Sequence, residues 1–197
     1  SPDYENKKIY NIRVKAIDNS NLSTESKISL LVNNLNESPT ELKLRNLSID
    51  ENVSPNSLFS AISTTDPDLD DNHTYSLVSG LGDTDNNLFM ISGKSLLINH
   101  SPDYEHKSIY SVRLKSEDTG FLSTSKTFTL SVNNLNEAPT SIGLTTSSVN
   151  ENVSAKTTVA LLTTVDSDSS DTHSYSLVTG AGSVDNGSFL IDGTNLK

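Results

Sequence analysis

The sequence is built on an internal repeat of about one hundred residues. The segment SPDYE at residues 1–5 returns unchanged at 101–105, and VNNLNESPT at 32–40 returns as VNNLNEAPT at 132–140. When the chain is shifted by one period, about half of the aligned positions are identical. A unit of this length is the usual size of one small β-sandwich, so the 197 residues are expected to hold parts of more than one domain.

Short segments of the repeat alternate between apolar and polar residues. Tyr10, Ile12, Val14 and Ala16 are apolar or small, and the residues between them are polar. Such period-two alternation is typical of a half-buried β-strand. Further short apolar runs are separated by Gly, Asn, Asp and Ser, and no segment has a sustained helical period. We therefore predict an all-β fold of tandem Ig-like β-sandwiches.

The repeat boundaries are marked by proline. Pro39 and Pro139 follow the strand that closes each unit, and proline cannot donate to a sheet ladder. The junctions are therefore expected in the short polar linkers NNLNESP and NNLNEAP. This divides the chain into the C-terminal part of one repeat at 1–38, a complete repeat at 39–138, and the N-terminal part of the next at 139–197.

Neither flanking part is expected to close a sandwich alone. Each would leave an apolar strand face uncovered, such as Val14 in one part and Leu177 in the other. Residues 139–197 followed by 1–38 nevertheless contain the motifs of one repeat in order. We therefore expect head-to-tail contact with copies of the chain or with neighbouring repeats of one polymer, in which a 139–197 segment covers Ile12, Val14, Ile28 and Leu30.

Charge and composition exclude several partners and sites. The net charge is −11, with 25 acidic and 14 basic residues, which argues against nucleic acid and anionic membrane surfaces. There is no cysteine, so disulfides, zinc–thiolate sites and thiol catalysis are excluded. No apolar run is long enough to insert into a membrane. This composition is typical of a bacterial extracellular or cell-surface protein.

Acidic motifs recur in phase with the repeat: PDYE, EN, NLNE, and DPD or DSD, with a lone Asp closing a strand. Alternate residues of an extended chain point the same way, so D-x-E and D-x-D each direct two carboxylates to one place. Several carboxylates at one junction repel each other unless a cation is present. Ca²⁺ takes six to eight oxygen ligands and fits this pattern.

The alternative is that these residues only form turns, for which Asp and Asn are well suited. An EF-hand is excluded because DPDLDDNHTYSL has Asp71 where that loop needs Gly and Leu77 where it needs Glu. Asp85, in the segment GDTDNN, is interpreted as a turn former without a partner motif one repeat away.

In order along the chain, NLNEAPT, ENV, TDPD, TYSLVSG, SPDYE and a strand ending in Asp resemble the cadherin-like repeats of large bacterial surface and secreted proteins. The resemblance covers essentially the whole chain and implies tandem cadherin-like Greek-key β-sandwiches with Ca²⁺ at each junction. Near residue 37 the implied ligands are Asp3, Glu5, Asn34, Asn36, Glu37, Asp66, Asp68 and Asp118. Near residue 137 they are Glu51, Asp103, Glu105, Asn134, Asn136, Glu137, Asp166 and Asp168.

Two features depart from the animal cadherin pattern. Tyr4 and Tyr104 replace the Arg of the D-R-E motif, which leaves both carboxylates in place. The linker is one residue shorter and has Asn where Asp is expected. The lower charge implies fewer or weaker ions than the three that animal junctions hold.

The leading functional hypothesis is a non-enzymatic structural repeat of an extracellular filament, surface layer or adhesin, made rigid by Ca²⁺, with a cell-surface or glycan partner. The alternative is a spacer or carbohydrate-binding module of a secreted multidomain hydrolase. Aromatic residues make up 6% of the chain and there is no Trp, which is few for a sugar-binding face. Each His stands alone, without a nucleophile motif or a phosphate loop, so we predict no enzymatic activity.

Overall fold

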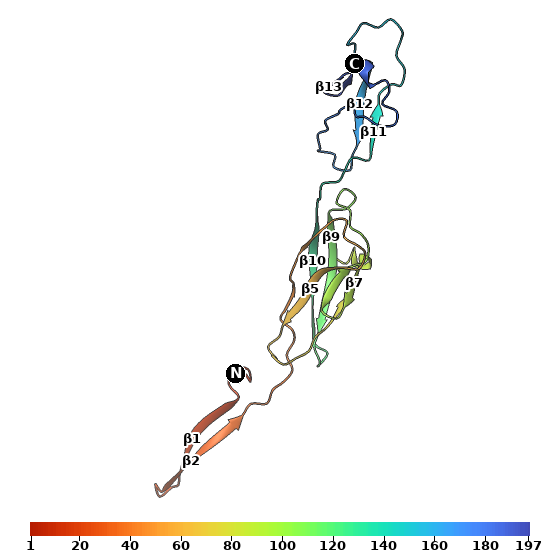
Figure 1. Cartoon of the computed structure of the whole chain (residues 1–197). Coiled ribbons are helices and arrows are strands. Elements are labelled where there is room, and N and C mark those ends of the chain that lie inside the picture. Colours follow the sequence, from red (N-terminus) through yellow and green to blue (C-terminus); the bar gives the residue numbers. More distant parts are fainter. The chain divides into compact units, whose positions relative to one another are not determined.

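Strands make up nearly all of the regular structure in the computed structural model, which describes residues 1–197 (Figure 1). The exceptions are two single turns of 3-10 helix, η1 (Asn86–Leu88) and η2 (Asn186–Ser188). No helical segment has the length and apolarity that a membrane span requires. The chain divides into two units, Ser1–Asn133 and Asn134–Lys197. The predicted all-β class is confirmed.

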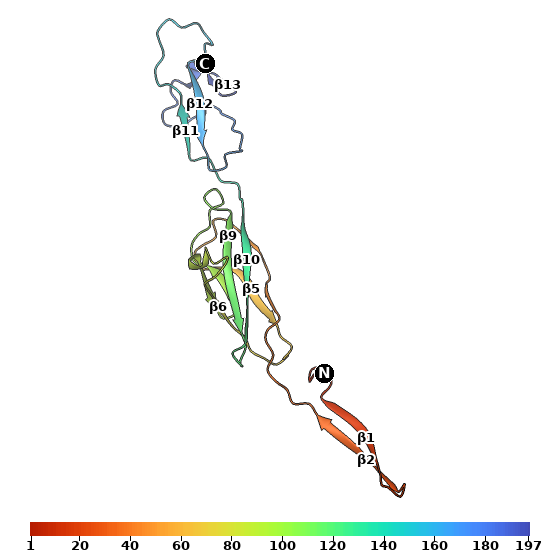
Figure 2. The same ribbon diagram turned by 180° about the vertical axis from the view of Figure 1, so that it is seen from behind.

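The first unit contains a β-sandwich of two four-stranded sheets (Figures 1 and 2). One sheet has the order β3-β5-β8-β7 and the other β4-β10-β9-β6. Strands β4 and β10 run parallel, whereas the other neighbours are antiparallel. The bounds are β3 (Glu41–Leu44), β4 (Ser48–Asp50), β5 (Ser57–Thr65), β6 (Thr74–Leu77), β7 (Phe89–Ser92), β8 (Ser95–Ile98), β9 (Ile109–Glu117) and β10 (Ser123–Asn133).

The core lies between these two sheets and follows the alternation in the sequence. In β9, Tyr110, Val112, Leu114 and Ser116 are buried, and the residues between them are partly exposed. The facing sheet contributes Leu42, Phe59, Phe89 and other apolar side chains to one continuous cluster. Since successive side chains of a strand point to opposite faces, period two places every second residue in this core.

The same pattern occurs at the start of the chain without a facing sheet. Strands β1 (Ile9–Ile17) and β2 (Ser23–Leu31) form a two-stranded antiparallel hairpin. They correspond to β9 and β10 one repeat earlier. Ile12 and Val14 are both 44% exposed, whereas their counterparts Val112 and Leu114 are fully buried. The predicted exposure of this apolar face is confirmed.

The second unit contains one four-stranded sheet, in the order β11-β12-β14-β13. It corresponds to the β3-β5-β8-β7 sheet of the first unit. Segments 148–150 and 174–177, the counterparts of β4 and β6, contain no strand. The bounds are β11 (Ser141–Leu144), β12 (Ala160–Val165), β13 (Ile191–Asp192) and β14 (Asn195–Leu196).

The interpretation of Asp85 as a turn former alone is wrong. Its carboxylate is buried and forms an ion pair with Lys107, with 2.5 Å between Oδ1 and Nζ. The other oxygen accepts the backbone N–H of Ser111 at 2.8 Å. Asp185 also occupies the corresponding position of the next repeat. Asp85 therefore ties the segment before η1 to Lys107 and to β9.

Replacing this carboxylate is expected to reduce stability in a pH-dependent way. Burial acts against the charge of Asp85, but donation by Lys107 and Ser111 outweighs it and holds the pKa of Asp85 below its ordinary value. Asp85→Asn is expected to lower the free energy of unfolding by about 1–3 kcal/mol at pH 7. A lowered folded pKa means that this stabilisation is complete above the unfolded pKa of about 3.9 and is lost as the pH falls through the folded value.

Urea unfolding at pH 7 and pH 3, both in chelator, measures the effect. The difference between the two proteins should shrink at pH 3. Asp70→Asn is the control, because Asp70 is exposed and carries the same change of charge. A difference that stays constant with pH would contradict the assigned role of the carboxylate.

Candidate metal centre

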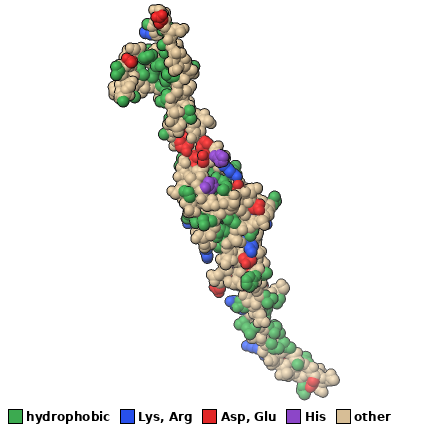
Figure 3. All heavy atoms as spheres, turned by 90° about the vertical axis from the view of Figure 1, so that its right-hand side faces the viewer, with side chains coloured by type: hydrophobic (Ala, Val, Ile, Leu, Met, Phe, Trp, Pro, Cys, Tyr) green, Lys and Arg blue, Asp and Glu red, His purple; other side chains and the backbone are tan.

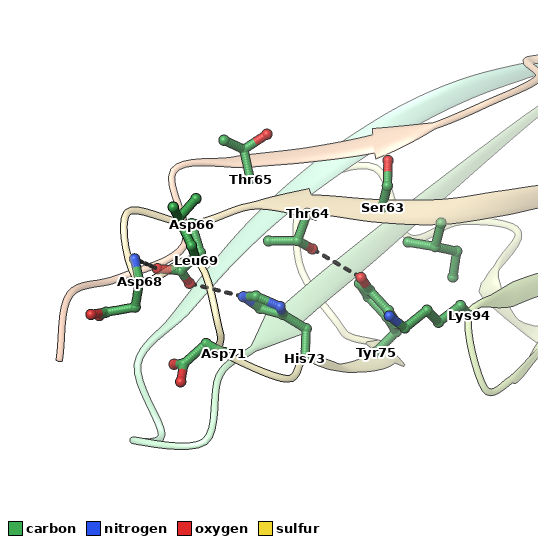
Figure 4. A pocket seen from close by; sticks show the side chains of 11 residues that line it. Ser63, Thr64, Thr65, Asp66, Asp68, Leu69, Asp71, His73, Tyr75 and Lys94 are labelled. Atoms are coloured by element: carbon green, nitrogen blue, oxygen red, sulfur yellow. Dashed lines mark hydrogen bonds and ion pairs between the residues drawn. The ribbon is translucent and has the colours of Figure 1, made fainter. Parts of the chain in front are cut away.

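The loop after β5 presents three aspartates, at 66, 68 and 71 (Figure 4). The Asp66 carboxylate fixes the start of the loop: Oδ1 accepts the backbone N–H of Asp68 at 3.0 Å, and Oδ2 lies 2.8 Å from Nε2 of His73. The backbone N–H of Asp71 donates to the carbonyl of Asp68 and closes a turn. Asp and Asn favour such turns because their side chains bond nearby backbone groups.

The first carboxylate cluster joins this loop to residues from two earlier segments. Oxygens of Glu5, Glu37 and Asp68 lie within 4.8 Å of one another. The backbone N–H of Glu37 donates to Asp68 Oδ2 at 2.8 Å. The side chain of Asn34 donates to Asp68 Oδ1 at 2.7 Å. The linker residues are thus bonded to the D-x-D motif.

The second cluster contains Asp66, Asp71 and Asp118, again with oxygens within 4.8 Å of one another. Asp66 and Asp118 are buried. Asn36 donates to Asp118 Oδ2 at 3.1 Å, and the Thr119 hydroxyl donates to Asp71 Oδ1 at 3.0 Å. Asp71 Oδ2 is buried and accepts no hydrogen bond. Burying an acceptor that receives no hydrogen bond costs free energy. This oxygen lacks the positive partner that would offset the cost.

Gly120 gives the linker access to this cluster. A Cβ atom built on Gly120 would lie 2.5 Å from Cγ of Asn36, well inside van der Waals contact. The absence of a side chain therefore lets the Asn36 amide reach Asp118. The corresponding residue of the β1–β2 hairpin is Ser20.

The two clusters carry more negative than positive charge. Partial desolvation, followed by repulsion from Glu5 and Asp68, raises the pKa of Glu37. Donation from the Glu37 backbone and from Asn34 lowers the pKa of Asp68. Of the six carboxylates, only that of Asp66 has a basic partner, His73. The arrangement concentrates negative charge and supplies little positive charge to offset it.

The donor set fits a hard cation. Every acidic side chain of the two clusters offers oxygen, and the neighbouring Asn side chains and backbone carbonyls offer more. Ca²⁺ prefers six to eight such oxygens and tolerates irregular geometry, whereas Mg²⁺ demands a near-ideal octahedron. The bare acceptor on Asp71 and the mutual repulsion at Glu37 are the two features that a bound cation would relieve.

The aspartates of the two PDYE motifs are placed differently from the rest. Asp3 Oδ1 accepts the backbone N–H of Asn6 at 2.9 Å, and Asp103 Oδ1 accepts that of His106 at 2.8 Å. Both carboxylates cap their own turn. Neither belongs to the two clusters described above.

The residues expected near residue 137 are divided between the two units. In the first unit, Glu51 is 1% exposed and its Oε2 accepts the backbone N–H of Tyr104 at 2.8 Å. Asp103 and Glu105 lie in the turn that contains Tyr104. Glu51 is thus fixed beside the turn that carries Glu105.

The second unit repeats the loop described for residues 66–73. The backbone N–H of Glu137 donates to Asp168 Oδ2 at 2.7 Å, and that of Asp168 donates to Asp166 Oδ1 at 3.1 Å. A hydrogen bond from His173 lowers the pKa of Asp166. In the linker, the Asn136 side chain donates to the Glu137 carbonyl, and Asn134 is exposed.

Sequence reasoning missed two residues of the candidate centre. Asp71 was considered only in rejecting an EF-hand, yet it supplies the bare buried oxygen. His73 was treated as isolated, yet it is bonded to Asp66. Both recur in phase, as Asp171 and His173. That recurrence was the available signal, and it pointed to D-x-D-x-x-D-x-H as the full motif.

The comparisons by sequence found no relative. No family model matches the chain, and no curated protein matches it.

Solved structures do match. The chain is similar to protocadherin gammaB7 extracellular domains 3–6, with a TM-score of 0.68 and 18% identity, over 99% of this chain and 51% of that one. It is similar to the protocadherin gammaB4 extracellular domain, with a TM-score of 0.61 and 22% identity, over 98% of this chain and 32% of that one. For human protocadherin-24 domains 1–2 the TM-score is 0.54 and the identity 20%, over 68% of this chain and 70% of that one.

The chain therefore spans about a third of the length of one gamma protocadherin structure and about half of the other. At these identities, what is shared is the arrangement of the strands. The likeness confirms that the chain has the cadherin-like fold.

Proposed function

We propose that this chain is a non-enzymatic structural repeat of an extracellular filament or adhesin, in which Ca²⁺ fixes successive β-sandwiches. The observation that carries the proposal is the buried Asp71 oxygen, which has no donor although it lies among two further buried carboxylates. Glu5, Glu37 and Asp68 would hold one ion, and Asp66, Asp71 and Asp118 another. The metal would supply the positive charge that these residues lack.

The consequence for the chain is restriction of the linker. Residues 34–37 already bond to Asp68 and Asp118 through neutral donors. An ion held by Glu37 together with Asp68 would add a second, charged connection between the linker and the loop after β5. A short linker held in this way loses the freedom that polar linkers ordinarily have.

An extracellular location is part of the proposal. Calcium sites of extracellular modules work at about 0.1–1 mM, concentrations found outside cells. The cadherin-like fold and the acidic composition support this location. End-to-end association with copies of the chain or with neighbouring repeats, and a cell-surface or glycan partner, belong to the same proposal.

Calorimetric titration of the whole chain with Ca²⁺ tests the proposal through Asp68→Asn. This change keeps the shape of the side chain and removes one charged ligand. The affinity of the affected site is expected to fall about tenfold or more, because calcium affinity follows the number of charged ligands.

Asp70→Asn is the matched control, since Asp70 lies in the same loop, is exposed and belongs to neither cluster. Its titration should superimpose on that of the unmodified chain. Absence of Ca²⁺ binding at millimolar concentration, or equal effects of the two variants, would refute the proposed role of the clusters.

A further inference from the structure

Strand β5 has a neighbouring strand on both sides for only part of its length. It pairs with β3 along residues 62–65, but with β8 only along residues 57–61. The N–H of Ile62 donates to the carbonyl of Lys94, the residue before β8. Since alternate backbone groups of a strand point to the same side, the N–H and C=O of Thr64 also point to that side, where β8 does not reach. Residues 62–65 therefore form an open strand edge.

A cleft of about 380 Å³ lies along this edge (Figure 4). It is lined by residues 62–65 and by Tyr75 of β6, whose hydroxyl accepts a hydrogen bond from Oγ1 of Thr64 at 3.2 Å. All of its lining residues lie between positions 62 and 94, within the sandwich that has both of its sheets. The volume is within the range of ligand-binding pockets.

The two ends of the cleft carry opposite charges. Asp66, Asp68 and Asp71 lie at the end where β5 stops, and Lys94 lies at the other, beside Ile62 (Figure 4). Lys94 is exposed and takes part in none of the ion pairs of the chain. On the face drawn in Figure 3, Lys and Arg side chains lie singly rather than in a patch. A single cation of this kind suits one carboxylate rather than a polyanion.

These charges favour one direction for a chain that pairs with the open edge. A peptide antiparallel to β5 runs in the direction of β8, so that its carboxyl end meets Lys94 and its amino end meets the aspartates. A parallel peptide would place its carboxylate among the aspartates, where like charges repel. Both ends of the cleft thus favour antiparallel pairing.

We propose that this cleft binds the carboxyl end of an extended peptide, which adds to β5 as an antiparallel strand. The C-terminal residue lies opposite Ser63, with its carboxylate at Lys94. The residue before it exchanges two backbone hydrogen bonds with Thr64, and its side chain lies beside Tyr75. A basic residue two positions further upstream lies at the aspartate end of the cleft. In such strand addition the backbone bonds provide affinity, and the side-chain pockets provide selectivity.

Titration of the whole ¹⁵N-labelled chain with acetyl-Lys-Thr-Val-Thr tests the proposal by NMR, in chelator so that the aspartates are free of metal. The probe with a free carboxylate should shift the amide signal of Thr64. The same peptide with a C-terminal amide should bind about fivefold more weakly, the effect of losing one exposed ion pair.

Lys94→Thr should cause the same loss for the free-carboxylate probe and none for the amide. Thr194 stands at this position in the next repeat, after Gly193, whose positive φ matches that of Gly93, so the turn accepts threonine. Lys126→Thr is the matched control, because Lys126 is exposed on β10, away from the cleft. It should leave both affinities unchanged.

Methylation of the probe backbone tests the register. A methyl group on the nitrogen of the Val removes the N–H that donates to Thr64 and should abolish binding. A methyl group on the nitrogen of the C-terminal Thr should have little effect, because that N–H points away from β5.

An unshifted Thr64 signal at millimolar probe overturns the proposal, as does equal affinity for the free carboxylate and the amide. Equal effects of the two methyl groups overturn the register. The inference goes beyond the proposed function, and its contacts with Thr64 and Lys94 need no metal. None of these results alters the calcium titration of Asp68→Asn, so the two proposals fail independently.

Discussion

Calcium is expected to stabilise the folded chain by about 2.7 kcal/mol for each site when it is present at one hundred times its dissociation constant. The physical reason is that the carboxylates of each cluster come from distant segments. Glu5, Glu37 and Asp68 meet only in the folded state. The unfolded chain therefore has no comparable site, and the free energy of Ca²⁺ binding adds to the free energy of unfolding. Thermal unfolding followed by circular dichroism, with millimolar Ca²⁺ and with chelator, measures the shift.

Two controls separate specific binding from a general effect of divalent charge. Mg²⁺ at the same concentration should raise the midpoint much less, because it fits irregular oxygen cages poorly. Asp68→Asn should lose part of the shift and Asp70→Asn none of it. If the midpoint is the same with calcium and with chelator, the clusters are not calcium sites and the proposed function fails.

Leu114→Ala is expected to lower the free energy of unfolding of the complete repeat by about 2–5 kcal/mol, the usual cost of truncating a fully buried leucine. Leu114 is fully buried in the cluster between the two sheets, and neighbouring side chains cannot fill the space that it leaves. Urea unfolding in chelator, at a concentration where the chain is monomeric, measures the loss.

The same strand position one repeat earlier provides the control. Val14 corresponds to Leu114 but is 44% exposed on the hairpin. Val14→Ala should change stability by no more than about 0.5 kcal/mol in the monomer, as for other surface positions. Equal losses in the two variants would mean that the hairpin face is covered in the monomer as well.

The fold could be predicted because it is encoded locally and then repeated. Alternation along residues 110–116 specifies which side chains of β9 enter the core, and the structure buries those residues. The absence of strands at 174–177 could not be predicted from local pattern. The sequence there closely matches that of β6, but a strand also needs a neighbour, and the neighbour of β6 is β9.

In the candidate site, too, local pattern predicted some of the residues, whereas others depend on contacts with other parts of the chain. Spacing within DPD predicted that Asp66 and Asp68 face one place, but the structure divides them between the two clusters, because Asp66 Oδ1 turns back to accept the backbone N–H of Asp68. Asp71 was not predicted because its contribution depends on a turn that brings the loop back. This turn is closed by a hydrogen bond from the Asp71 backbone N–H to the carbonyl of Asp68. Asp85 was misinterpreted for a related reason, because its partner Lys107 lies in a separate segment. Contacts between segments are set by the tertiary fold, and their signal in the sequence was recurrence one repeat later, as at Asp171 and Asp185.

The parallel pairing of β4 with β10 determines how the complete repeat carries mechanical tension. Tension along the chain pulls β4 towards its N-terminal end and β10 towards its C-terminal end. Because the two strands run in the same direction, these forces oppose each other along the strand axis, and the bonds between Ser48–Asp50 and Ser131–Asn133 are loaded together in shear. Bonds loaded together must break together, whereas an antiparallel hairpin pulled at its open end breaks one pair at a time. A filament built from such units would bear its load where β4 pairs with the closing strand β10 of each repeat.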